Sequence, residues 1–211
     1  LAMGNQRAIF LDRDGTLNEE VGYLRRTEDL RIYPEALEAV RKINQIGALT
    51  IVITNQSAIA RGFLNEEELG DLHGFLQEEF RREGARIDGF YYCPHHPDAG
   101  TGSYTQKCTC RKPQPGMLIR AARELHLEIA TSFMIGDKLD DVEAGHRAGC
   151  RSVLLKTGYG ESESRVLDQG RFSAPLEEVP LRRPVHVAEN VLKAVDWIME
   201  QTFERPAGIT D

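Results

Sequence analysis

Two aspartates follow a short apolar stretch near the start of the chain, in the run A-I-F-L-D-R-D-G-T-L over residues 8–17. An apolar run that ends in turn residues predicts a buried strand, and open α/β sheets bind ligands where such strands end. Residues two apart on an extended chain point to the same side. We therefore expect Asp12 and Asp14 to face one pocket and Arg13 to turn away. An acidic turn without chemistry is the alternative interpretation of this motif taken alone.

Two carboxylates in one small site repel each other unless a cation or a division of roles separates them. Mg²⁺ takes oxygen ligands and brings substrate phosphate with it. One carboxylate can then act as a nucleophile that forms an acyl phosphate, while the other serves as general acid and then as general base. The pair Asp12 and Asp14 therefore suits phosphoryl transfer.

Polar clusters also follow two later apolar runs. Residues 48–53 (A-L-T-I-V-I) precede Thr54-Asn55-Gln56-Ser57, and residues 132–135 (S-F-M-I) precede Gly136-Asp137-Lys138. In this arrangement Asp137 would add a carboxylate to the cation, and Thr54 and Asn55 would hydrogen-bond phosphate oxygens. Turn and cap chemistry is the alternative reading of Thr54-Asn55 if the first motif were absent.

Positive charge accompanies these clusters. Lys112, in the segment R-K-P-Q-P-G-M, would neutralise the nucleophile and the transferring phosphoryl group, and Arg111 and Lys138 add local charge beside the site. Asp140 and Asp141 follow one turn after Asp137 and can reach metal-bound water or a neighbouring lysine.

Three cysteines cluster with histidines between residues 93 and 110. The pattern Cys93-x-His95, twelve residues, Cys108-x-Cys110 predicts a tetrahedral structural Zn²⁺ site that is closed to substrate and holds the loop 93–110. His96 is the alternative ligand to His95. Cys150 is expected to be a buried core residue.

The order of predicted elements indicates an α/β fold with a doubly wound, mainly parallel sheet. Helices are predicted over 34–47, 66–83, 115–125, 139–148 and 188–203, and strands over 8–11, 48–53, 87–92, 132–135, 152–155 and 185–187. Residues 18–33 form a long polar connection that is either a solvated loop or a flap over the substrate, with Gly22 and Tyr23 at its centre. Residues 157–184 show little periodicity.

Composition sets outer limits on function. The 211 residues carry 41% hydrophobic and 28% charged residues with a net charge of −7, which is ordinary for one globular domain and argues against general nucleic-acid or membrane-surface binding. No apolar run approaches the roughly 20 residues of a membrane span. The start lacks a signal-peptide core, so we expect a cytoplasmic protein. We also expect the protein to be a monomer.

These motifs together resemble the haloacid dehalogenase superfamily of phosphotransferases: D-R-D-G-T, T-N, the Lys112 segment and G-D-K-L-D-D appear in that family's order. The resemblance implies a Rossmann-like domain over 1–211 without a large cap domain. It also implies Asp12 as nucleophile, Asp14 as acid/base, phosphate contacts from Thr54 and Lys112, and Mg²⁺ on Asp12, Asp137 and the Asp14 backbone carbonyl.

Residues 7–158 resemble more narrowly the heptose bisphosphate phosphatases of that superfamily, through T-N-Q-S-x-I-A-R-G, Y-Y-C-P-H-H-P and C-x-C-R-K-P-x-P-G-M. This implies removal of the 7-phosphate from a heptose 1,7-bisphosphate, with Arg111 or Arg61 available to a second phosphate. The implied substrate contacts are Arg13, Glu20, Gly22, Tyr23, Asn55, Gln56, Ser57, Arg61, Arg111 and Lys138.

Three alternatives stay open at this point. The related histidinol-phosphate phosphatases share the zinc loop, and their amine substrate would favour an acidic contact such as Glu19 or Glu20. A non-enzymatic phospho-acceptor is disfavoured because Asp14 would help to hydrolyse the phospho-aspartate. A phosphatase acting on nucleic-acid ends is disfavoured by the acidic chain and its lack of a basic stripe.

Overall fold

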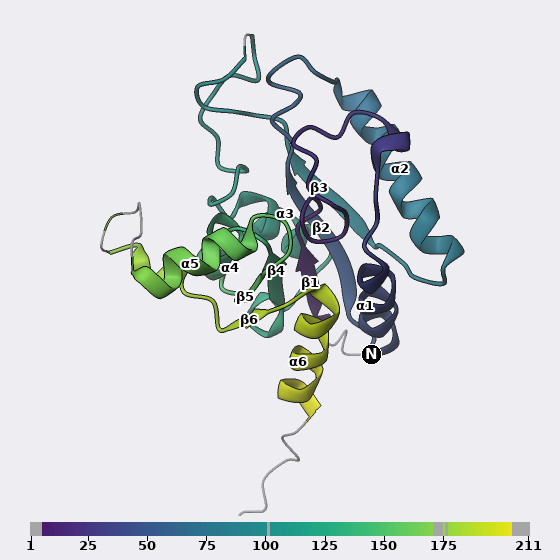
Figure 1. The fold of residues 1–211 in the computed structure, drawn as a ribbon, viewed down its shortest axis with the longest axis vertical. Helices are drawn as coiled ribbons and strands as arrows, with labels where there is room; N and C mark the ends of the chain where they lie inside the picture. Colours follow the sequence, from purple (N-terminus) through teal and green to yellow (C-terminus); the bar gives the residue numbers. More distant parts are fainter. Residues whose placement is uncertain (1–5, 101, 171–174, 176, 204–211) are drawn as a thin grey trace, which may run out of the picture.

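Six parallel strands form one sheet at the centre of the molecule (Figure 1). The computed structural model describes residues 6–100, 102–170, 175 and 177–203. The strands are β1 (Ala8–Leu11), β2 (Leu49–Asn55), β3 (Gly89–Cys93), β4 (Phe133–Gly136), β5 (Arg151–Leu155) and β6 (His186–Ala188). Their order is β3-β2-β1-β4-β5-β6, and each neighbouring pair is parallel. The predicted parallel sheet is confirmed.

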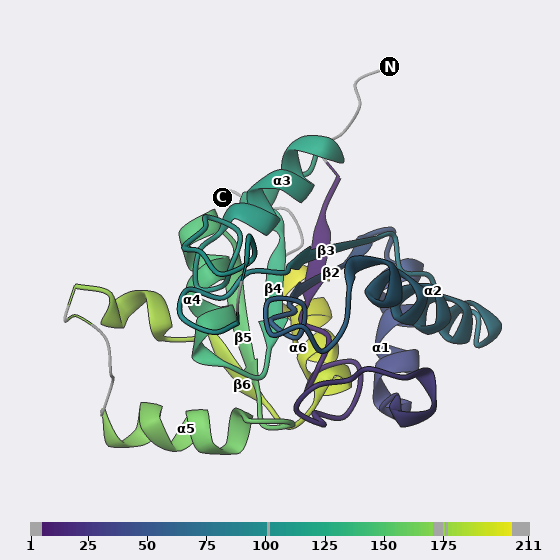
Figure 2. The same ribbon diagram turned by 90° about the horizontal axis from the view of Figure 1, so that it is seen from above.

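Helices cover both faces of this sheet, so its central strands are apolar throughout. The helices are α1 (Pro34–Gln45), α2 (Glu66–Arg82), α3 (Gly116–Glu124), α4 (Leu139–Ala148), α5 (Gly160–Gln169) and α6 (Val191–Phe203), with short 3₁₀ turns at Thr27–Asp29, Ile129–Thr131 and Val179–Arg182. Figure 2 shows α1 and α2 on one side of the sheet and α3 and α4 on the other.

Alternate residues of β1 pack in two separate cores. Ile9 and Leu11 of β1 pack in the larger core with residues of α1, α2 and α6, whereas Ala8 and Phe10 pack in a second core with residues of α3 and α4. This alternation fixes the face on which every side chain at the end of β1 can lie.

Local signals set the helix boundaries that matter here. Pro34 occupies the first turn of α1, and Asn65 caps α2: its side chain accepts the Glu68 N–H, and Glu68 accepts the Asn65 N–H. The last helix begins at Val191 rather than at the predicted residue 188, because β6 continues to Ala188 and the Asn190 side chain accepts the Lys193 N–H.

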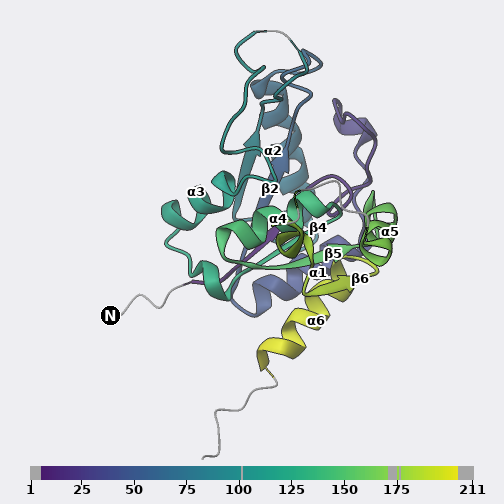
Figure 3. The same cartoon turned by 90° about the vertical axis from the view of Figure 1, so that its left-hand side faces the viewer.

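Three connections lie toward one end of the sheet: the flap 18–33, the segment 56–65 and the loop that follows β3 (Figures 1 and 3). Between β1 and β2 the described chain contains only the flap and α1, so no cap domain is inserted there. Among the described residues, no helix has both the length and the apolar character needed to span a bilayer.

Candidate active site

A cavity of about 330 Å³ opens at the carboxyl ends of β1, β2 and β4. Most residues that the sequence singled out meet there. The predicted residues that line it are Asp12, Asp14, Glu20, Gly22, Tyr23, Thr54, Asn55, Gln56, Ser57, Arg111, Lys112 and Lys138. Asp140 and Asp141, which the sequence also singled out, complete the lining together with Ala58 and Tyr159, whereas Arg13, Arg61 and Asp137 are not part of it.

Lys112 is the central cation of the site. Its ammonium lies 2.9 Å from Asp12 and 2.6 Å from Asp141, and it donates to the Ile53 carbonyl at 2.7 Å. Burial lowers the pKa of Lys112, but the two carboxylates outweigh this effect and hold it above its usual value. Asn55 fixes the backbone of the same residue through its side-chain oxygen and nitrogen, at 3.0 and 3.1 Å. Lys112 is therefore charged and positioned before any substrate arrives.

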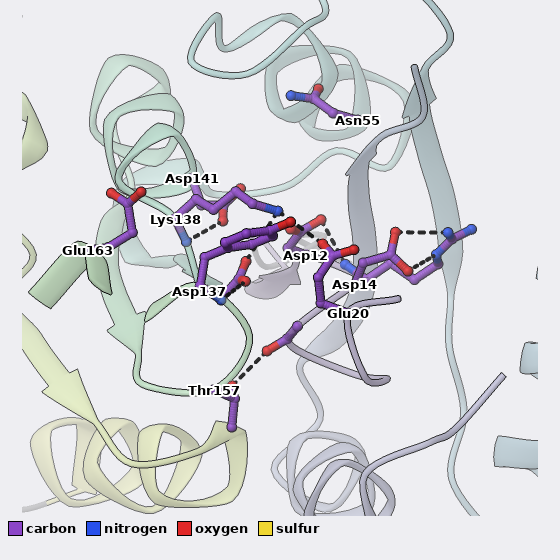
Figure 4. Close-up of polar contacts among 12 residues, drawn as sticks. Asp12, Asp14, Glu20, Asn55, Asp137, Lys138, Asp141, Thr157 and Glu163 are labelled. Carbon is purple, nitrogen blue, oxygen red and sulfur yellow. Dashed lines mark hydrogen bonds and ion pairs between the residues drawn. The ribbon is translucent and has the colours of Figure 1, made fainter. Parts of the chain in front are cut away.

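Three buried carboxylates lie beside this lysine (Figure 4). Asp12, Asp137 and Asp141 each offer an oxygen within 4.8 Å of the others. One oxygen of Asp137 is buried without a hydrogen-bond partner, while the other accepts the Tyr159 N–H at 2.8 Å. Burial raises the pKa of Asp137 to about 8, and nearby Asp12 and Asp141 act in the same direction. The first of these Asp137 oxygens lies 3.8 Å from the Lys138 ammonium, and a buried oxygen that accepts no hydrogen bond within an acidic cluster fits a divalent cation.

The Asp14 carboxylate has a different environment. It accepts two hydrogen bonds from Arg13, one from Asn18 and one from Gln56, and Figure 4 shows it turned away from Asp137 and Asp141. Burial raises the pKa of Asp14, but the charge of Arg13 and these hydrogen bonds lower it below its usual range. Both aspartates line the cavity as predicted, and each pairs with a different cation: Asp14 with Arg13, and Asp12 with Lys112.

Arg13 is buried beside Asp14. Its side chain does turn away from the cavity, as the alternation of the strand predicts, and it is 1% exposed. The guanidinium lies between Asp14, Gln56 at 3.2 Å and His73 at 3.3 Å. A side chain enclosed in this way positions Asp14, and any substrate contact of Arg13 would have to come from its backbone.

A loop after β5 enters the site without any signal in the sequence. The Thr157 hydroxyl donates to the Gly15 carbonyl at 2.6 Å, and the Tyr159 ring lies 4.5 Å from the Lys138 ammonium. Gly158 touches the Asp137 carboxylate so closely that a Cβ there would lie 2.2 Å from its oxygen. These residues act mainly through backbone and close packing, which a search for polar clusters does not find.

The flap approaches the cavity from two sides. Glu20 lies 3.4 Å from the Lys138 ammonium and accepts the Gly22 N–H at 2.7 Å. Burial opposes the charge of Lys138, yet the surrounding carboxylates raise its pKa well above the usual value. Arg61 does not line the cavity, and its guanidinium stacks over the Tyr23 ring at 5.6 Å from its centroid, so its expected substrate contact stays a prediction.

The predicted zinc ligands form a separate cluster. Ligand atoms of Cys93, His95, Cys108 and Cys110 all lie within 4.8 Å of one another, and the closest sulfur pair, Cys93 and Cys110, is 3.1 Å apart. His96 lies outside this cluster, because its Nδ1 accepts the N–H groups of Asp98 and Ala99. Four donors of this kind fit a closed tetrahedral metal site.

Comparisons with known proteins agree with this geometry. The model of the haloacid dehalogenase-like hydrolase family matches residues 6–149, and a second model, of HAD-like hydrolases, matches residues 109–194. The D-glycero-beta-D-manno-heptose-1,7-bisphosphate 7-phosphatase of Pasteurella multocida is 44% identical over 154 residues, which are 72% of this chain and 83% of the relative. The enzyme of the same name from Salmonella typhi is 41% identical over 204 residues, 96% of this chain and 94% of that one.

A solved structure extends the likeness to the fold. The D,D-heptose 1,7-bisphosphate phosphatase from B. bronchiseptica, crystallised with magnesium and phosphate, is 28% identical and has a TM-score of 0.77. The match covers 93% of this chain and 99% of that chain. Family model, relatives, fold and site agree, and the chain therefore belongs to the haloacid dehalogenase-like hydrolases.

Proposed function

We propose that this chain is a phosphatase that removes the 7-phosphate from D-glycero-D-manno-heptose 1,7-bisphosphate through a phospho-aspartate intermediate. The relatives at 40–45% identity carry this name. The observation that supports the chemistry most directly is the contact of Asp12 with the buried Lys112, at the end of the central strand and beside two further carboxylates.

In the first step an Asp12 oxygen attacks phosphorus, the bond to the sugar oxygen breaks, and Asp14 donates a proton to the departing alkoxide. Lys112 and backbone groups stabilise the charge of the transferring phosphoryl group. In the second step Asp14 takes a proton from water, which attacks the acyl phosphate and releases Asp12 and inorganic phosphate. The phosphate dianion lies close to Asp14 and opposes its ionisation, which favours the protonated form that the first step needs.

Asp12, Asp137 and the Asp14 backbone carbonyl would hold a Mg²⁺ ion, and the Asp137 oxygen that accepts no hydrogen bond supports this assignment. When bound, this ion offsets the repulsion between the carboxylates and the phosphate dianion. The Cys93, His95, Cys108 and Cys110 cluster would hold a structural Zn²⁺ that fixes the loop leading to Arg111 and Lys112.

The charges of the cavity favour a bisphosphate over an amine-bearing monophosphate. Arg111 and Lys138 line its wall and suit a second phosphate. Of Glu19 and Glu20, the acidic contacts expected for an amine, Glu20 lines the cavity but is already engaged by Lys138 and by the Gly22 N–H, and Glu19 does not line it. Arg61 lies behind Tyr23, so we assign the second phosphate to Arg111. The absence of a nucleic-acid partner and the monomeric state remain predictions.

The decisive experiment compares phosphate release from heptose 1,7-bisphosphate and from histidinol phosphate, with phosphorus NMR to identify the phosphate removed. We expect preference for the bisphosphate and loss of the 7-phosphate. An Asp12→Asn variant should be inactive with both. Faster turnover of histidinol phosphate would reject the substrate, and full activity of Asp12→Asn would reject the mechanism.

A further inference from the structure

The tip of the flap carries an aromatic contact that the chemistry does not use. The rings of Tyr23 and Phe63 meet edge to face, with their centroids 5.0 Å apart. Phe63 belongs to the segment before α2 and does not line the active-site cavity, whereas Tyr23 does. The contact therefore joins a wall of the cavity to a residue outside it.

Two arginines enclose this pair. The Arg61 guanidinium lies 5.6 Å from the Tyr23 centroid, and that of Arg25 lies 5.8 Å from the Phe63 centroid. Tyr23 and Phe63 remain 42% and 45% exposed. Such an arrangement adds little to the main core, but it gives the rings a preferred geometry at the surface.

The flap has few other attachments near its tip. Its backbone hydrogen bonds there are internal, with the Tyr23 N–H donating to Val21 and the Gly22 N–H to the Glu20 side chain. Leu24 is buried in the main core and anchors the chain just after Tyr23. Glu20 meets Lys138 on the other side of the cavity. The Tyr23 ring thus depends on Phe63 and Arg61 for its position.

We propose that Phe63 is a positioning residue for substrate binding: its ring holds Tyr23, and with it the flap, against the cavity. This inference rests on the proposed function, because it concerns the substrate of that cavity. Phe63 acts through Tyr23 and does not touch the reacting atoms, so its loss should weaken binding and leave the chemical step largely intact.

Phe63→Ala tests this with heptose 1,7-bisphosphate as substrate. We expect KM to rise about 2- to 10-fold, the range of an edge-to-face pair, with little change in kcat. Phe63→Trp keeps an aromatic ring and should restore most of the affinity. The matched control is Phe75→Ala, since Phe75 is also an exposed aromatic, at 38%, but lies on α2 and makes no ring contact with Tyr23. Partial unfolding would instead lower the active fraction, and hence kcat, without changing KM.

A second measurement does not depend on the substrate. Arg25 and Arg26 are exposed on the flap, and trypsin cleaves after arginine, so flap mobility can be followed by the rate of cleavage there. Phe63→Ala should be cut faster than the wild type, and Phe75→Ala at the wild-type rate. Unchanged cleavage and unchanged KM in Phe63→Ala would overturn the inference, as would an equal effect of Phe75→Ala. If the bisphosphate is not turned over at all, the proposed function fails while the cleavage rates still decide the role of Phe63.

Discussion

Replacing Lys112 by Met, alone and together with Asp141→Asn, should distinguish the contribution of Lys112 to stability from its contribution to catalysis. The substitution keeps the length of the side chain and removes the ammonium that contacts both Asp12 and Asp141, at 2.9 and 2.6 Å. Lys112 and Asp141 are 3% and 1% exposed, so water cannot replace the lost partner. Removing one member of a buried ion pair costs about 3–5 kcal/mol. This is a large part of the roughly 5–15 kcal/mol that stabilises a domain.

The assay is urea unfolding at pH 7 in magnesium-free buffer, with turnover measured in parallel. Lys112→Met should lose about 3–5 kcal/mol of unfolding free energy. Adding Asp141→Asn removes one of the two buried carboxylates that have lost the Lys112 ammonium, and should recover a substantial part of the lost unfolding free energy. Both variants should show turnover at least about 100-fold lower, because neither restores a cation at the transferring phosphoryl group.

Lys42→Met provides the matched control. Lys42 also contacts two carboxylates, Asp196 and Glu38, but its side chain is 31% exposed, and pairs of this kind contribute at most about 1 kcal/mol. The reasoning is refuted if Lys112→Met is as stable as the wild type, or if adding Asp141→Asn recovers no stability. Recovery of activity in the double variant would refute the catalytic role of Lys112.

Three further predictions test other parts of the structure. Burial lowers the pKa of His73 from 6.5 to about 3, so at pH values between these two the unfolded state binds a proton that the folded state does not. The free energy of unfolding should therefore decrease as the pH is lowered below about 6.5, with a slope approaching ~1.4 kcal/mol per pH unit. Urea unfolding at several pH values should show a flatter slope in His73→Gln. Gly158→Ala should lower turnover more than about 10-fold, because its Cβ would lie 2.2 Å from an Asp137 oxygen; Gly170→Ala, also at positive φ but in open space, should retain wild-type turnover. Metal analysis of the purified protein should find one zinc per chain, lost in Cys108→Ser and kept in Cys150→Ser; equal zinc in both variants would contradict the assignment.

The site residues that could be predicted from the sequence alone are those at the carboxyl ends of strands. Asp12, Thr54 and Asp137 each come directly after an apolar run, and parallel strands bring such positions to one edge of the sheet. The prediction of this juxtaposition needed no knowledge of tertiary contacts.

The sequence did not reveal which partners the arginine side chains contact, or which contacts the backbone makes. The alternation of side chains along the strand predicted that Arg13 turns away from the cavity. It did not reveal that the guanidinium contacts Asp14, Gln56 and His73. Arg61 follows a motif rich in polar residues, yet it stacks on an aromatic ring. Gly158 and Tyr159 lie in a stretch without periodicity, and they reach Asp137 through a close approach and an N–H group.

The pairing of β1 with β4 has a consequence for synthesis of the protein. Leu11 lies beside Ile135, the Ala8 N–H donates to the Ser132 side chain, and Thr157 reaches back to Gly15, so the two halves of the acidic cluster are separated by more than a hundred residues of chain. On the ribosome, Asp12 therefore emerges long before Asp137 and Asp141, and β1 cannot pair with β4 until that later segment has been made. A nascent or prematurely terminated chain that ends before β4 contains Asp12 but cannot form the acidic cluster. Such an incomplete chain should therefore have no phosphatase activity.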